Sequence, residues 1–105
     1  MKLDGINILV TAGGTEEPID GVRRLVNSST GATGLAIAGR LQKHGADVLL
    51  LHSARVDVSG FQGEKKPFLT FGDLSDALQG LLANRHFDAV IHLAAVSDYH
   101  LAGIE

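Results

Sequence analysis

The sequence predicts an α/β fold, namely a Rossmann-like doubly wound parallel sheet with strand order 3-2-1-4. Short apolar runs that do not alternate with polar residues are typical of parallel strands buried on both faces. Stretches with helical spacing of apolar residues divide these runs into the order strand, helix, strand, strand, helix, strand. A glycine-rich turn directly after the first run favours a nucleotide-binding version of this fold.

The first strand is expected at Ile6–Val10, where the residues are apolar and rich in β-branched side chains. Thr11–Thr15 follows as a tight turn of small residues, in which glycine permits a positive φ and the close approach of a ligand to the backbone. The charged stretch from residue 16 to 24 is expected to form a loop or a short helical turn.

The first helix is expected at Ala32–His44, with its polar cap in Asn27–Thr30 and its C-terminal cap at Gly45. The second strand is expected at Asp47–Leu51, which is a further apolar run. We expect residues 52–66 to form a long polar loop.

The third strand is expected at Pro67–Phe71, with Lys65 as an alternative start. Asp73 is expected to cap the second helix, whose apolar residues recur at helical spacing. These residues are Leu74, Ala77, Leu78, Leu81 and Leu82. The fourth strand is expected at Asp88–Leu93.

Two unusual segments, Thr11–Gly14 and Ala94–Asp98, follow the ends of the first and fourth strands. With the predicted strand order these strands are neighbours at the switch point of the sheet, where ligands bind beyond the carboxyl ends. We therefore expect the two segments to meet at one site.

Length and composition exclude several classes of protein. The 105 residues suffice for one domain, and we expect residues 1–105 to form a single nucleotide-binding domain, incomplete and roughly the first half of a larger one. The net charge of −3, without a basic block, argues against a nucleic-acid partner. The absence of cysteine excludes disulfides and thiolate metal sites. No apolar run is long enough to span a membrane and the N-terminus lacks the features of a signal peptide, so we expect a cytoplasmic protein.

An NADP-dependent Rossmann oxidoreductase is an alternative on these residues. The first turn departs from the G-x-G-x-x-G pattern, because Gly14 lies well before the next helix. His52 and Ser53 stand at the end of the second strand, where dinucleotide-binding domains carry an acidic ribose ligand, but Arg55 is able to bind a 2′-phosphate. No G-K-[ST] phosphate loop is present.

Three motifs together resemble one family. They are T-A-G-G-T-E-E-P-I-D-G-V-R at Thr11–Arg23, N-S-S-T-G-A-T-G at Asn27–Gly34 and A-A-V-S-D-Y at Ala94–Tyr99. In this order and spacing they resemble phosphopantothenate–cysteine ligase, the phosphopantothenoylcysteine synthetase part of the coenzyme A biosynthesis (DNA/pantothenate metabolism) flavoprotein family. The resemblance runs from Ile6 to Tyr99.

The resemblance implies a reaction of coenzyme A biosynthesis. CTP or ATP, with Mg²⁺, activates the carboxylate of 4′-phosphopantothenate as an acyl-nucleotide, and the amine of cysteine then forms the amide. By resemblance, Asn27 is the catalytic residue that holds the intermediate, and Asp98 contacts the nucleotide. The other residues of the implied nucleotide-binding site are Gly13, Gly14, Ser29, Thr30, Gly31, Ala94 and Ala95. N–H groups at a helix start suit a triphosphate, and small alanines let a base or ribose lie against the backbone.

Several residues keep two interpretations. Asn27, Ser29 and Thr30 also fit simple helix caps. The acids of the stretch from 16 to 24 either approach Mg²⁺ or line a solvated loop, so no metal ligands are assigned. Its arginines either bind a substrate phosphate or pair with those acids.

The family pattern continues beyond its D-Y motif with a lysine-containing stretch that contacts the nucleotide phosphates. We therefore expect this chain to carry the nucleotide-binding half of the ligase domain, with a C-terminal half or a second copy as candidate partners. A third alternative is a non-catalytic nucleotide-binding module that becomes active only with a partner chain.

Overall fold

The computed structural model describes residues 2–18, 24–26 and 31–94. The elements in chain order are β1 (Asn7–Ala12), β2 (Glu16–Pro18), β3 (Arg24–Val26), α1 (Ala32–Lys43), β4 (Asp47–Ser53), β5 (Glu64–Phe68), α2 (Phe71–Asn84) and β6 (Ala89–His92). The main sheet has the order β5-β4-β1-β6, and all its pairs are parallel. These four strands are the third, second, first and fourth that the sequence predicted, so the Rossmann-like class and the order 3-2-1-4 are confirmed.

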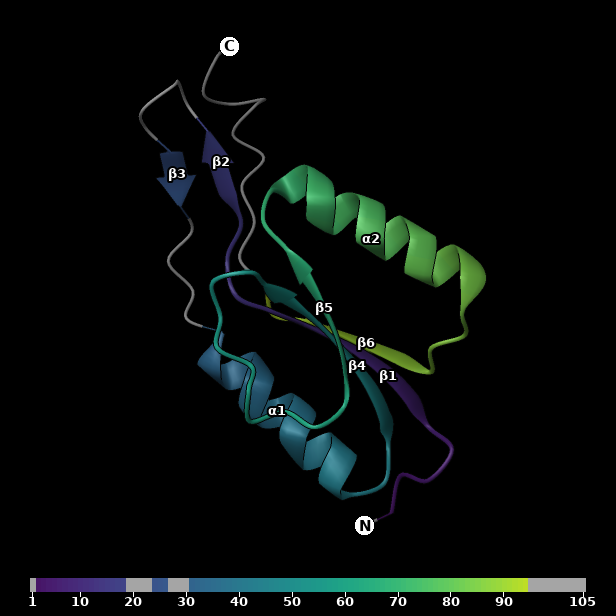
Figure 1. Cartoon of the computed structure of the whole chain (residues 1–105). Helices are drawn as coiled ribbons and strands as arrows, with labels where there is room; N and C mark the ends of the chain where they lie inside the picture. Colours follow the sequence, from purple (N-terminus) through teal and green to yellow (C-terminus); the bar gives the residue numbers. More distant parts are fainter. Residues whose placement is uncertain (1, 19–23, 27–30, 95–105) are drawn as a thin grey trace.

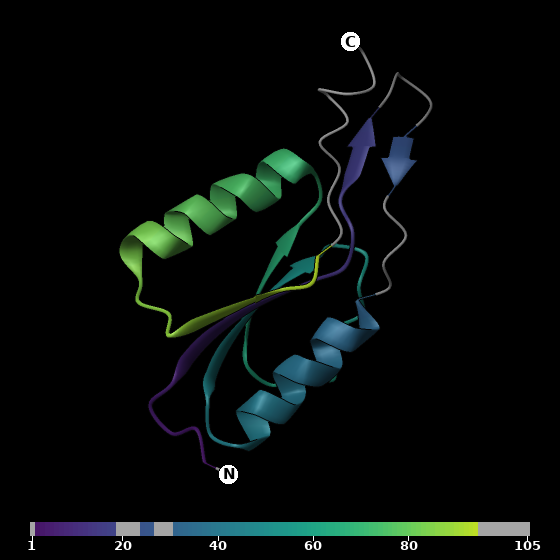
Figure 2. The ribbon, with the colours of Figure 1, turned by 180° about the vertical axis from the view of Figure 1, so that it is seen from behind.

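The sheet lies between the two helices, with α1 on one face and α2 on the other (Figures 1 and 2). Successive residues of β1 enter opposite cores. Ile8 and Val10 pack with Ala38 of α1, whereas Leu9 packs with Leu74 of α2. Because both faces are buried, both sets of alternating positions must be apolar, which explains the unbroken apolar runs of the sequence.

β1 is central and pairs with both β4 and β6, so that Val10 lies opposite Leu50 on one side and Ile91 on the other. Parallel pairing places the C-terminal ends of these strands at one edge, which we call the carboxyl edge. The opposite, amino edge holds the strand starts. There the Asp88 N–H donates to the Asn7 carbonyl at 2.7 Å, and the Asn7 N–H donates to the Asp88 carboxylate at 2.8 Å.

The ends of several strands differ from those predicted. β1 and β4 run on to Ala12 and Ser53, so both reach closer to the carboxyl edge than expected. β5 begins at Glu64, one residue before the alternative start at Lys65, and ends at Phe68, which corrects the range predicted as Pro67–Phe71. The range was misplaced because the first residues of this edge strand are exposed and charged, and therefore lack an apolar pattern. The loop expected at 52–66 shrinks to residues 54–63.

The stretch predicted as a loop or helical turn contains a hairpin instead, in which β2 pairs antiparallel with β3. Each strand has only three residues, too few for an apolar alternation to mark it. The hairpin extends outward from the carboxyl edge (Figure 1).

The start of α1 also corrects a prediction, because its N-cap is Gly31 rather than a residue of the polar run before it. α1 ends at Lys43, with His44 as its C-cap, and Gly45 follows with a φ of +101°. The cap is therefore His44 and not Gly45 as predicted, but Gly45 directly after it takes the left-handed position that glycine favours.

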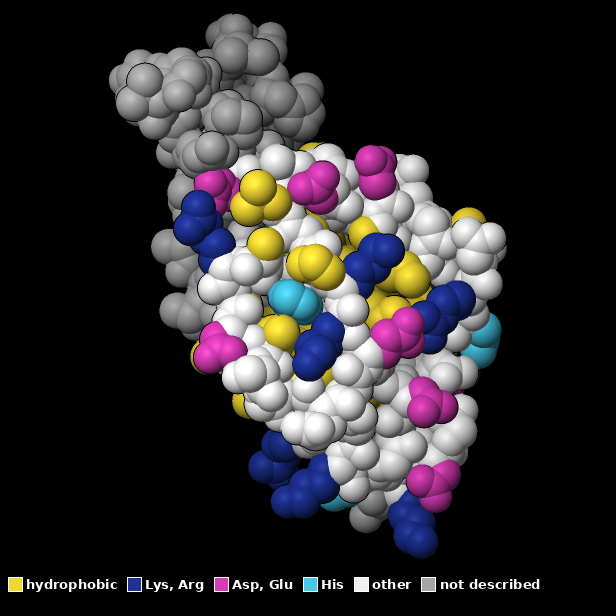
Figure 3. Space-filling view, in the orientation of Figure 1, with side chains coloured by type: hydrophobic (Ala, Val, Ile, Leu, Met, Phe, Trp, Pro, Cys, Tyr) yellow, Lys and Arg dark blue, Asp and Glu magenta, His cyan; other side chains and the backbone are white. Residues whose placement is uncertain are grey.

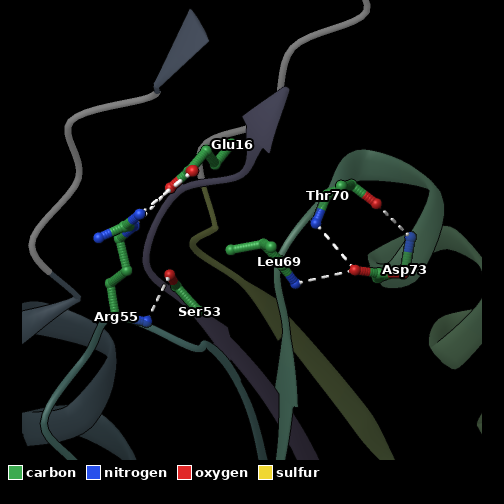
Figure 4. Close-up of polar contacts among 6 residues, drawn as sticks. All are labelled: Glu16, Ser53, Arg55, Leu69, Thr70 and Asp73. Carbon is green, nitrogen blue, oxygen red and sulfur yellow. Dashed lines mark hydrogen bonds and ion pairs between the residues drawn. The ribbon is translucent and has the colours of Figure 1, made fainter. Parts of the chain in front are cut away.

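α2 begins at Phe71 with Thr70 as its N-cap, which corrects the prediction that Asp73 caps the helix. Thr70 Oγ1 accepts from the Asp73 N–H at 3.0 Å, and Asp73 Oδ2 accepts from the Thr70 N–H at 3.0 Å (Figure 4). Asp73 is thus the third helical residue of a capping box. The Thr70 N–H, and less strongly that of Leu69, lowers the pKa of the Asp73 carboxyl.

The surface in Figure 3 carries charged side chains of both signs, with hydrophobic side chains visible between them. Among the described residues, Leu82 of α2 and Val90 of β6 are large hydrophobic side chains that stay about half exposed, at 51% and 45%. None of the described helices is both long and apolar enough to span a bilayer.

Candidate functional site

Two glycines with left-handed backbone meet at the carboxyl edge. Gly13 follows β1 with a φ of +94°, and Gly31 precedes α1 with a φ of +78°. A Cβ on Gly13 would lie 2.6 Å from Ser53 Cβ, and a Cβ on Gly31 would lie 2.7 Å from Val56 Cγ2. Val56 Cγ2 is also 2.9 Å from the Cβ position of Gly13, so it packs against both glycines. We call Gly13, Gly31, Ser53 and Val56 the glycine junction.

A third glycine brings the start of α1 against the end of β1. A Cβ on Gly34 would lie 2.5 Å from Ala12 Cβ and 3.3 Å from the Thr11 carbonyl oxygen, so a larger residue would force the end of β1 or the start of α1 to shift. The first turn of α1 has no acidic residue. Because Gly31 is the N-cap of α1, the positive end of the helix dipole lies at the glycine junction. This arrangement favours an anion such as a phosphate.

Thr11 joins the end of β6 to the end of β1. Its Oγ1 accepts from the N–H groups of Leu93 and Ala94 at 2.9 and 3.1 Å, and lies 2.8 Å from His92 Nδ1. The two N–H groups occupy both lone pairs of the hydroxyl, so its hydrogen is left for His92 Nδ1. Thr11 is fully buried and Ala94 is 8% exposed. The first residue of the A-A-V-S-D-Y motif is thereby held next to the glycine-rich turn.

The turn after β4 forms the third side of the site. The Val56 N–H donates to the Ser53 carbonyl at 3.0 Å, and the Arg55 N–H donates to Ser53 Oγ at 3.2 Å. The Ala54 N–H donates to the Phe68 carbonyl at 2.7 Å, which ties the turn to the end of β5. Ser53, Arg55 and Val56 are therefore fixed together at the carboxyl edge.

Arg55 forms a two-point ion pair with Glu16 at the start of β2 (Figure 4). Arg55 Nε donates to Glu16 Oε1, and Nη2 donates to Oε2 at 3.2 Å. The Glu16 side chain is 2% exposed, whereas that of Arg55 is 67% exposed. Hydrogen bonding to Glu16, together with its charge, raises the pKa of the Arg55 guanidinium above its ordinary value. The pair thus brings a buried carboxylate and a permanent cation together beside the glycine junction.

The structure describes four of the predicted site residues, namely Gly13, Gly14, Gly31 and Ala94. It brings Gly13 and Gly31 into contact around Val56, and it holds Ala94 by way of Thr11. Gly14 is buried between Gly13 and the hairpin. The other predicted residues, Asn27, Ser29, Thr30, Ala95 and Asp98, lie outside the described residues.

Sequence reasoning missed the roles of Thr11, Val56 and the Glu16–Arg55 pair. A hydroxyl at the end of a buried strand was the available signal for Thr11. Glu16 was expected to approach a metal or line a solvated loop, but its side chain is buried, so the solvated alternative is wrong for this residue. Its partner lies 39 residues away, and no spacing rule indicates such a pair.

Comparisons with known proteins point to one family. The chain matches the family model described as the DNA/pantothenate metabolism flavoprotein C-terminal domain over residues 3–105. The coenzyme A biosynthesis bifunctional protein CoaBC of Thermococcus kodakarensis is 35% identical over 100 residues, which cover 95% of this chain and 25% of that protein. The chain therefore spans about a quarter of the length of this curated relative.

Solved structures share the fold. The DNA/pantothenate metabolism flavoprotein from Streptococcus pneumoniae superimposes with a TM-score of 0.81 at 33% identity, covering 90% of this chain and 43% of that one. The C-terminal domain of CoaBC superimposes with a TM-score of 0.78 at 35% identity, covering 91% of this chain and 48% of that one. These matches confirm the resemblance predicted from the three motifs. The chain belongs to the family of DNA/pantothenate metabolism flavoprotein C-terminal domains.

Proposed function

We propose that this chain carries the nucleotide-binding half of a ligase domain that joins 4′-phosphopantothenate to cysteine through an acyl-nucleotide, with CTP or ATP as co-substrate. The observation that carries the proposal is the meeting of Gly13 and Gly31 with the start of α1 at the carboxyl edge. The name of the CoaBC relatives, which places them in coenzyme A biosynthesis, supports the same reaction.

The glycine junction suits the triphosphate. Gly13 and Gly31 have no side chains to keep a phosphate from the backbone, and the dipole of α1 favours its negative charge. Asn27, Ser29 and Thr30 precede Gly31 directly in the chain, and their proposed roles in holding the phosphates and the acyl-nucleotide rest on the resemblance. A neutral amide such as Asn27 donates a hydrogen bond to a developing oxyanion without changing its protonation.

The end of β6 suits the nucleoside. Ala94 is small, and its N–H is fixed by Thr11 Oγ1, so the backbone offers a firm surface for a base or ribose. Ala95 and Asp98 continue this segment, and we propose by resemblance that the Asp98 carboxylate accepts a hydrogen bond from the nucleotide.

We propose that Mg²⁺ enters with the triphosphate. The described part of the chain contains no cluster of three acidic or histidine side chains that could hold a metal, and the Glu16 carboxylate is engaged by Arg55. Mg²⁺ commonly keeps several waters and binds one or two carboxylates together with substrate phosphates. Its contribution would be to offset the charge of the phosphates.

The pairing of Arg55 favours the ligase over an NADP-dependent oxidoreductase. A guanidinium that binds a 2′-phosphate needs the N–H groups along one edge of its plane for the phosphate oxygens. Two of the nitrogens of Arg55 already face Glu16, whose negative charge would repel a second anion.

Calorimetric titration with CTP, ATP and NADPH, each with Mg²⁺, tests the proposal. We expect CTP or ATP to bind and NADPH not to bind. Gly31→Ala, which strains the left-handed backbone, should abolish the binding, and so should Asn27→Ala combined with Asp98→Ala. Gly39→Ala is the control, because its Cβ would meet no atom within 4 Å. Binding of NADPH alone, or of none of the three, would contradict the proposal.

A further inference from the structure

The Glu16–Arg55 pair connects two structures that the chain separates. Glu16 begins the β2–β3 hairpin, and Arg55 lies in the turn after β4 that carries Val56. Figure 4 shows the guanidinium reaching across to the Glu16 carboxylate from this turn. Glu16 lies three residues after Gly13 in the chain, and Arg55 directly precedes Val56, so both residues of the pair adjoin the glycine junction.

Glu16 is held by both its backbone and its side chain. Its N–H donates to the Leu69 carbonyl at 2.8 Å just beyond β5, and its carboxylate binds Arg55. The turn that carries Arg55 is itself tied to β5 through the Ala54 N–H. The first residue of the hairpin is thus fixed to the sheet by its backbone and to the turn by its side chain.

Val56 depends on this arrangement. It follows Arg55 directly, and its Cγ2 atom occupies the space beside both Gly13 and Gly31. A change in the direction of Arg55 would rotate the turn and move Val56 against the backbones of Gly13 and Gly31, where an added Cβ would already lie within 3 Å of its Cγ2 atom. Interiors packed this closely transmit such a shift instead of absorbing it.

We propose that the Glu16–Arg55 pair is a positioning clamp that sets the spacing of the glycine junction and thereby the affinity of the site for a nucleoside triphosphate. This inference rests on the proposed function for its ligand. Arg55 acts through Val56 and Glu16 acts by holding Arg55, so both are positioning residues rather than catalytic ones. The charge of Arg55 serves to hold Glu16 and not to bind the nucleotide.

The chain offers a matched control in a second arginine–glutamate pair. Arg85 Nη1 donates to both carboxylate oxygens of Glu64, at 3.1 and 3.0 Å. Glu64 is the first residue of β5, so this pair lies at the amino edge, away from the glycine junction. Arg85→Gln removes an arginine–glutamate pair of a more exposed kind at the opposite edge of the sheet.

The test is a double-mutant cycle on nucleotide affinity, with circular dichroism to confirm folding. We expect Arg55→Gln and Glu16→Gln each to weaken CTP or ATP binding about tenfold, and the double variant also about tenfold rather than about a hundredfold, because the pair acts as one unit. Arg55→Lys should restore part of the affinity. Arg85→Gln should leave it unchanged. Additive losses, or unchanged affinity in Arg55→Gln, would overturn the proposal.

Amide NMR shifts separate this inference from the proposed function. Gly31 is the reporter, because it is distant in sequence from both Glu16 and Arg55. We expect its amide signal to move in Arg55→Gln and to stay in place in Arg85→Gln, whether or not any nucleotide binds. If the wild-type chain binds no nucleotide, the proposed function fails and the Gly31 signal alone decides the clamp. An unmoved Gly31 signal in Arg55→Gln would refute it.

Discussion

Replacing Thr11 with valine tests how the end of β6 is held at the site. Valine keeps the branched shape at this fully buried position but has no acceptor for the two N–H groups. The Leu93 N–H keeps the Thr11 carbonyl as a partner at 3.2 Å. The Ala94 N–H loses its bond to Oγ1, so the substitution leaves one buried donor without that partner.

The expected loss of stability follows from this one buried N–H group. One unsatisfied buried N–H costs about 1–3 kcal/mol. A domain of this size has a free energy of unfolding of about 5–15 kcal/mol, so the Thr11→Val protein should still fold. Its melting temperature should fall by roughly 4–8 °C for each kcal/mol lost. Thr11→Ser is the matched control, because it keeps Oγ1 and loses a methyl group worth about 0.5–1.5 kcal/mol.

Amide hydrogen exchange isolates the effect. In Thr11→Val the Ala94 amide should exchange about 5- to 150-fold faster than in the wild type, which is the lost free energy expressed as an equilibrium ratio. In Thr11→Ser it should exchange close to the wild-type rate, although urea unfolding shows some loss of stability. Equal exchange of the Ala94 amide in the two variants would refute the reasoning.

Three further predictions concern stability. Gly34→Ala should destabilise the fold by about 1–3 kcal/mol because its Cβ meets Ala12, whereas Gly39→Ala in the same helix should stabilise it by about 0.5–1 kcal/mol; urea unfolding compares them. Thr70→Ala should cost about 1 kcal/mol in the same assay through loss of the α2 cap. The folded-state pKa of Asp73 lies below its ordinary 3.8, so its contribution is complete above that pH and is lost as the pH falls through the folded-state value. Asp73→Asn should therefore flatten the acid side of the stability profile, and an unchanged profile would contradict this.

The buried part of the fold was predictable from the sequence because its physical signal is local. The run around Leu9 is apolar at every position because both faces of β1 are covered, and this pattern predicted a buried parallel strand. The strand order then followed from the handedness of crossovers. For the same reason the meeting of the glycine-rich turn with Ala94 could be expected before the structure was known.

The predictions that were wrong or missing concern features that no short stretch of sequence indicates. β5 is an edge strand whose first residues are charged, so apolar pattern misplaced it. Thr70 and Asp73 form a reciprocal cap, and only their hydrogen bonds tell which of them precedes the helix. The Glu16–Arg55 pair depends on tertiary contact alone, because neither residue shares an element or a period with the other.

The central place of β1 has a consequence for the order in which the protein folds. Thr11 and His92 are 81 positions apart in the sequence, so β1, the earliest of the described strands in the sequence, gains its second neighbour only when nearly all the described chain has been made. Closing so long a loop costs more entropy than forming β1, α1 and β4, and contacts this distant slow folding. We expect β6 to dock after the other described strands of the main sheet. The glycine junction would then form before Ala94 is in place, and the proposed nucleoside side of the site would form only when β6 docks.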